Sequence, residues 1–134
     1  MAETRAPVAR PVSPHLQIYR LTLSMVMSGL HRITGLALVA GMILLTWWLL
    51  AAAAGQNAYG TFQAFTASWI GRLILFGFSW ALLHHLFGGL RYLVWDLGYG
   101  LEPAEREWLV RANIIGSIIA TVILWLILAI SGMR

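Results

Sequence analysis

Two adjacent histidines, His84 and His85, lie in the middle of a long apolar stretch of this 134-residue chain. Ionisable side chains are costly inside a membrane span, so we treat both as candidate functional groups. They precede Arg91 by about two helical turns, or roughly 10 Å along a helix. Imidazole is a strong axial ligand for haem iron. Consecutive rings point about 100° apart, so at most one of them binds a given iron. The equally weighted alternative is a polar side chain hydrogen-bonded across a helical bundle.

A second polar group, Ser28, His31 and Arg32, stands at the head of another apolar run. Spacings of three and four residues place all three side chains on one helical face. Arginine can hold a haem propionate or a quinone carbonyl, and serine offers a hydroxyl donor. The competing interpretation is a set of positively charged anchors at the membrane surface.

Glycines and charged residues accompany the histidines. Gly88 and Gly89 follow them by one turn and would let a flat macrocycle or another helix backbone approach closely. Arg91 and Asp96 come next, where a plain interfacial anchor explains them equally well.

The elements that carry these residues must cross a membrane. Sixty per cent of the chain is hydrophobic and 10% is charged, against about 25% charged in soluble domains. Three stretches are long and apolar enough to span about 30 Å of hydrocarbon. We predict an all-α integral membrane protein, with helices near residues 29–54, 69–95 and 110–133 and a loop at residues 55–68.

Arginine placement predicts the topology. The chain has a net charge of +4, and its arginines are scattered without a basic run, so nucleic acid is excluded as a partner. Arginines are concentrated before the first span and between the second and third. The positive-inside rule then puts the amino terminus inside and the carboxy terminus outside. We expect residues 1–28 to form a basic arm on the inner face, and residues 29–134 to form a three-helix transmembrane anchor domain.

Three ordered motifs resemble those of a known family. They are RPVSPHLQIY at residues 10–19, SGLHRITG at residues 28–35, and the pattern H-x-x-x-G-x-R-Y-x-x-x-D-L-G from His85 to Gly98. Together they resemble the cytochrome b-556 membrane-anchor subunit of succinate dehydrogenase, respiratory complex II. Tyr92 departs from the pattern, because the family usually has a histidine there.

The resemblance implies roles for individual residues. His85 would be the axial ligand of haem b, with His84 as the runner-up. Ser28 and Arg32 would bind quinone, with the arginine stabilising an oxygen electrostatically instead of donating a proton. His31 would contact a haem propionate.

Arg91 and Asp96 would lie near the propionates or the quinone entrance. The resemblance also implies a heteromeric helical bundle with a second small membrane-anchor subunit that shares the haem. A flavoprotein would oxidise succinate, and an iron–sulfur protein would pass electrons to ubiquinone beside this chain. Cysteine is absent from the sequence, which fits an anchor without an iron–sulfur cluster. We expect a bacterial inner membrane, or alternatively a mitochondrial inner membrane.

Three rival functions stay open at this point. The first is the anchor of a fumarate reductase, which runs the same chemistry in reverse. The second is a purely structural membrane subunit, which predicts no Soret absorption and a dispensable His85. A small transporter is a distant third, because three spans without a repeat or a broken helix do not resemble a transporter.

Overall fold

The computed structural model describes residues 19–132, which form four α-helices and no strand. In chain order these are α1 (Leu23–Ala54), α2 (Gln56–Ala67), α3 (Trp69–Asp96) and α4 (Pro103–Ile130). The predicted all-helical fold is confirmed. All but the last residue of the motif at residues 10–19, and most of the predicted basic arm, lie outside the described residues.

Three of these helices are long and apolar enough to cross a membrane, with 32, 28 and 28 residues for α1, α3 and α4. A helix of 28 residues is about 42 Å long, which exceeds the roughly 30 Å of hydrocarbon. The helices therefore tilt or extend into the headgroup layers. The three predicted spans are confirmed.

Helices α1 and α4 start before the spans predicted at residues 29–54 and 110–133, because apolar composition does not reveal a helix cap. Helix α1 begins at Leu23, where the hydroxyl of Thr22 accepts a hydrogen bond from the backbone N–H of Met25 at 3.4 Å. Helix α4 begins at Pro103, whose missing N–H costs nothing in the first turn. In each case the helix begins several residues before the uncharged apolar run that predicted the span.

The predicted loop at residues 55–68 is wrong, because most of it forms α2. This segment is polar but contains no proline, and tertiary packing supports the helix. The rings of Phe62 and Phe65 lie 5.0 and 5.1 Å from that of Trp47 on α1. The hydroxyl of Ser68 then caps α3 by accepting from the N–H of Gly71 at 3.1 Å.

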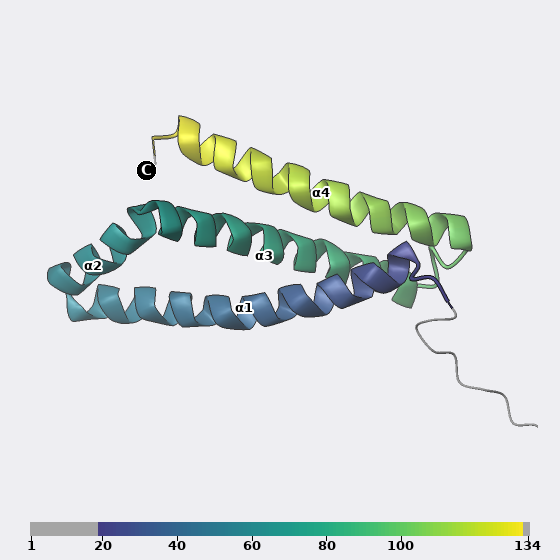
Figure 1. The fold of residues 1–134 in the computed structure, drawn as a ribbon, viewed down its shortest axis with the longest axis horizontal. Helices are drawn as coiled ribbons and strands as arrows, with labels where there is room; N and C mark the ends of the chain where they lie inside the picture. The colour runs from purple at the N-terminus through teal and green to yellow at the C-terminus, as the bar shows by residue number, and fades with distance from the viewer. Residues whose placement is uncertain (1–18, 133–134) are drawn as a thin grey trace, which may run out of the picture.

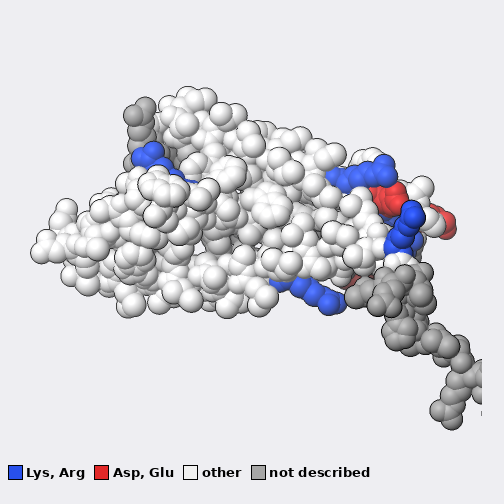
Figure 2. All heavy atoms as spheres, in the orientation of Figure 1, with Lys and Arg blue, Asp and Glu red and all other residues white. Residues whose placement is uncertain are grey.

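Helix α3 lies between α1 and α4, and α2 joins α1 to α3 at one end of the molecule (Figure 1). Charged side chains gather at the other end, where α1 begins and residues 97–102 connect α3 to α4 (Figure 2). We call this the charged end and the other the α2 end. Within the described residues, Arg72 is the one charged side chain near the α2 end.

The interior of the described bundle is more polar than apolar. Four hydrophobic residues are buried: Met27, Ala51, Ala81 and Val110. Six polar or charged residues are buried: Thr34, His84, Arg91, Asn113, Ser117 and Thr121. This composition suits a membrane bundle, where hydrocarbon surrounds the apolar faces and polar side chains hold the helices together.

Candidate functional site

His84 faces α4 and is completely buried. Its Nδ1 lies 3.2 Å from Oγ of Ser117, whose own hydroxyl donates to the carbonyl of Ile114 at 2.9 Å. Because that hydroxyl hydrogen is already used, Nδ1 of His84 is the donor and Nε2 keeps its lone pair. Nε2 is buried and has no hydrogen-bond partner.

Asn113 extends the contact between these two helices, and Thr121 is buried one turn beyond Ser117 on α4. With its amide oriented to satisfy both atoms, Asn113 donates to the carbonyl of His84 at 3.3 Å and accepts from the N–H of Gly88 at 3.2 Å. Thr121 donates to the carbonyl of Ser117 at 2.7 Å. We call His84, Asn113, Ser117 and Thr121 the α3–α4 seam.

His85 points instead toward α1, as the 100° offset between consecutive positions requires. Its Nδ1 lies 3.1 Å from the carbonyl oxygen of His31 and 3.4 Å from Oγ of Thr34. A carbonyl oxygen only accepts, so Nδ1 of His85 carries the proton and Nε2 keeps its lone pair. Unlike His84, the His85 side chain is half-buried and retains exposed surface.

The ring of His31 stacks on that of His85, with centroids 3.9 Å apart and planes 10° from parallel. His31 reaches this position because Gly88 has no side chain, and a Cβ there would overlap the His31 ring. At Gly88 we predicted the close approach of a macrocycle or of a helix backbone. The group that approaches is instead the imidazole ring of His31. Gly89 has nothing within 4 Å of a Cβ position.

Arg91 is buried on the same side of α3, one turn nearer the charged end than Gly88. Its guanidinium carbon lies 4.9 Å from the ring centre of Trp95 and 5.3 Å from that of Tyr92. Tyr92 in turn makes an edge contact with His31 at 5.3 Å. Two guanidinium nitrogens, Nε and Nη1, are buried without an acceptor. Arginine keeps its charge at any working pH, so these donors call for an anionic partner.

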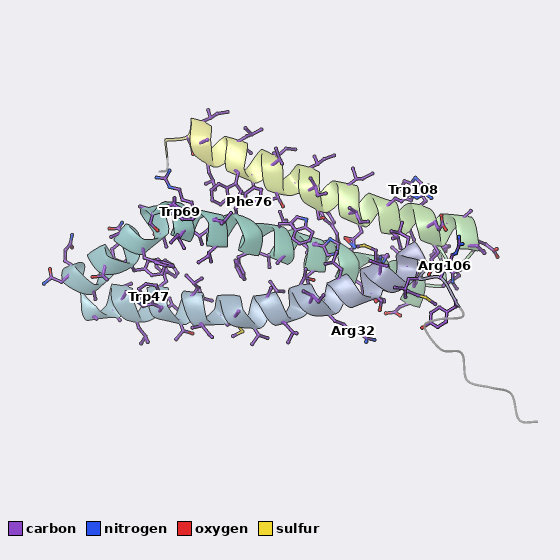
Figure 3. All side chains as sticks on the ribbon, viewed as in Figure 1. Arg32, Trp47, Trp69, Phe76, Arg106 and Trp108 are labelled. Carbon is purple, nitrogen blue, oxygen red and sulfur yellow. The ribbon has the colours of Figure 1, made fainter. Side chains whose placement is uncertain are left out.

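The remaining predicted site residues lie apart from this cluster. Ser28 is half-buried on α1, whereas Arg32 is exposed and points away from α3 and α4 (Figure 3). Asp96 is exposed at the end of α3. Among the described residues, the single ion pair joins Glu107 to Arg111 at 2.8 Å, so Arg91 and Asp96 do not pair with each other.

Sequence reasoning missed the partners of the histidines. Thr34 stands within a motif without a distinctive signal of its own, and Asn113 and Ser117 lie in a span without charged residues. Polar residues at 113, 117 and 121 repeat every four positions, which marks one face of a helix. That repeat was the signal that could have revealed the α3–α4 seam.

The donor chemistry of the site fits a haem that takes one axial ligand from this chain. A metal-bound imidazole usually donates its second ring nitrogen to a carbonyl or a carboxylate, which fixes the tautomer. His85 has this arrangement and an accessible ring. His84 has the same tautomer, but its free nitrogen is enclosed in the α3–α4 seam.

An all-helical membrane protein with a buried cluster of histidine and other polar side chains is the class that this fold defines. Residues 7–132 match the family described as succinate dehydrogenase/fumarate reductase transmembrane subunit. The chain belongs to this family.

Curated relatives are similar over most of the chain. The succinate dehydrogenase cytochrome b556 subunit of Paracoccus denitrificans is 48% identical over 114 residues, covering 85% of this chain and 88% of the relative. The subunit of the same name from Rickettsia felis is 37% identical over 116 residues, covering 87% and 90%. The cytochrome b560 subunit of Reclinomonas americana is 37% identical over 127 residues, covering 90% and 87%.

Proposed function

We propose that this chain is the cytochrome b membrane anchor of a succinate dehydrogenase, with His85 as the axial ligand of haem b. The proposal rests on family membership and on one observation. The Nδ1 proton of His85 is held by the His31 carbonyl, which leaves the lone pair of Nε2 free to bind iron. When bound, haem supplies a one-electron centre within the membrane.

Arg91 is proposed to bind a haem propionate. Its two unpartnered nitrogens, Nε and Nη1, are buried beside Tyr92 and Trp95, and a carboxylate would accept from them. His31 carries a further unpartnered buried nitrogen, Nδ1, and is proposed to contact the same propionate region.

Ser28 and Arg32 are proposed to bind ubiquinone near the charged end. Ser28 offers a hydroxyl donor to a quinone oxygen, and Arg32 offers a fixed positive charge. Arg32 projects away from α3 and α4, so a quinone pocket there would be completed by other subunits. Asp96, at the end of α3, is proposed to lie near the entrance of this pocket.

The partners in this proposal are a flavoprotein, an iron–sulfur protein and a second small membrane anchor that provides the other axial histidine. The relatives named above are all subunits of succinate dehydrogenase, which favours succinate oxidation over the fumarate reductase alternative. The proposed location is a bacterial inner membrane.

Visible difference spectra test the proposal. The assembled complex should be purified from the membrane with the unchanged chain, with His85→Ala and with His84→Ala, and recorded reduced minus oxidised. We expect a b-type spectrum from the unchanged complex, its loss in His85→Ala and its retention in His84→Ala.

Two results would contradict the proposal. Retention of the spectrum in His85→Ala with its loss in His84→Ala would make His84 the haem ligand in place of His85. Absence of Soret absorption from the unchanged complex would make this chain a structural subunit.

A further inference from the structure

We propose that Thr34 and Gly35 are positioning residues that fix the orientation and tautomer of the His85 ring. This inference rests on the proposed role of His85 as a haem ligand. Together with the carbonyl of His31 they form what we call the α1 seat, a surface of helix α1 against which the ring lies. The seat gives a function to the last two residues of the motif at residues 28–35, which neither the haem nor the quinone proposal uses.

Thr34 is the polar part of the seat. Its side chain is 2% exposed, although it lies on a helix that is otherwise largely exposed. Its hydroxyl lies 3.0 Å from the carbonyl of Leu30 and 2.9 Å from that of His31, so its hydrogen is directed along α1. The oxygen is then free to accept, and Nδ1 of His85 lies 3.4 Å away.

The proton on Nδ1 of His85 therefore faces two acceptors from α1. The carbonyl of His31 is the nearer, at 3.1 Å, and the hydroxyl of Thr34 is the second. Two acceptors on one side of the ring hold the proton on Nδ1 and limit rotation of the ring. Such outer partners orient metal-bound histidines and raise their basicity.

Gly35 is the steric part of the seat. A Cβ built at this position would lie 3.2 Å from Cε1 and 3.7 Å from Nδ1 of His85. The first distance is tighter than ordinary van der Waals contact, so a methyl group at position 35 would push the ring away from α1. Glycine thus allows the ring to come close enough for its Nδ1 to reach the carbonyl of His31.

The hydroxyl is tested by Thr34→Val, which keeps the shape of the side chain, and by Thr34→Ser, which keeps the hydroxyl. The matched control is Thr46→Val, because the Thr46 hydroxyl is also bonded to its own helix, to Met42 at 2.8 Å, and is exposed. In the purified complex we would measure the haem-to-protein ratio, the low-spin EPR spectrum and the haem midpoint potential. We expect Thr34→Val to shift the EPR spectrum and the potential, Thr34→Ser to restore both, and Thr46→Val to match the unchanged complex.

The steric part is tested by Gly35→Ala, with Gly77→Ala as its control because a Cβ at Gly77 meets nothing within 4 Å. We expect Gly35→Ala to shift the EPR spectrum and to lower haem occupancy several-fold, whereas Gly77→Ala does neither. These readouts report the ligand itself, and a general loss of fold would instead reduce the yield of assembled complex.

The outcomes separate this inference from the function it depends on. If His85→Ala loses the haem while Thr34→Val and Gly35→Ala give the same spectra and potentials as their controls, the α1 seat is wrong and the haem assignment stands. If His85→Ala keeps the haem, both are wrong.

Discussion

At the scale of single residues, helix α3 directs two neighbouring histidines toward different helices. His84 is enclosed against Ser117 of α4, and His85 lies against the backbone of α1. Both have a free Nε2, so tautomer alone does not distinguish them. Solvent exposure does distinguish the two histidines, because His84 has no exposed surface and His85 has some. Some exposed surface is what the proposed haem, shared with a second subunit, would require of its ligand.

The quinone proposal also belongs to the residue scale. Replacing Ser28 with alanine removes one neutral hydrogen bond, worth about 0.5–1.5 kcal/mol, so we expect a several-fold loss of quinone reductase activity. Replacing Arg32 with leucine removes a charge-assisted contact of roughly twice that strength, so its loss should be larger. The measurement is ubiquinone reduction by succinate in the assembled complex, at low quinone concentration.

An artificial dye that takes electrons from the hydrophilic subunits provides the control. Reduction of this dye by succinate should continue in both variants, which shows that the complex is assembled. If both variants reduce ubiquinone normally, Ser28 and Arg32 are surface anchors and the quinone site lies on the partner subunits.

At the scale of elements, polar side chains hold α4 to α3. Interhelical hydrogen bonds in membrane proteins average only about 0.6 kcal/mol, but leaving a buried donor unpaired costs about 1–3 kcal/mol. His84 is such a donor once its partner is removed. Removing one residue of the α3–α4 seam should therefore cost more stability than each intact hydrogen bond contributes.

We expect Ser117→Ala to destabilise the complex by about 1–3 kcal/mol, because Nδ1 of His84 loses its acceptor. The double variant with Ser117→Ala and His84→Phe should lose less stability than the sum of the losses in the two single variants, since no unpaired donor then remains. Thermal stability of the detergent-solubilised complex would be measured. Ser131→Ala is the matched control, because its hydroxyl also bonds the carbonyl three residues earlier but is exposed. Equal stability of the Ser117 and Ser131 variants would show that the seam contributes nothing.

The sequence predicted the three spans because each is a long uninterrupted apolar run, which is the strongest signal that a membrane protein offers. It failed at α2, because a polar composition predicts a loop whereas the packing of Phe62 and Phe65 on Trp47 supports a helix. It predicted that His84 and His85 diverge, because helical geometry dictates this. It could not predict which neighbour each ring meets, because that depends on how the helices pack.

At the scale of the whole molecule, most of the apolar surface of the three spans is exposed. No more than 17% of the most apolar window of any span is buried within the chain itself. The exposed apolar side chains that run along α1, α3 and α4 face lipid or other subunits. Trp47 and Trp69 lie toward the α2 end and Trp108 lies at the charged end (Figure 3), as is typical of aromatic residues at the two membrane surfaces.

The asymmetry of charge along the bundle predicts how it sits in the membrane. Arginines at the charged end include Arg20, Arg106 and Arg111, whereas Arg72 is alone near the α2 end within the described residues. The positive-inside rule places the charged end inside and the α2 end outside. A reporter fused after Arg134 should therefore be active on the outer side, because α4 runs from the charged end to the α2 end.

Cysteine labelling checks this orientation in the full chain, which contains no cysteine of its own. Gln56→Cys and Glu102→Cys place one exposed thiol at each end of the bundle. In spheroplasts, whose inner membrane is intact, a thiol reagent that cannot cross membranes should label position 56. Position 102 should be labelled only after the inner membrane is opened. The reverse pattern would invert the topology, and it would place Ser28 and Arg32 on the side of the membrane opposite to the proposed site of quinone reduction.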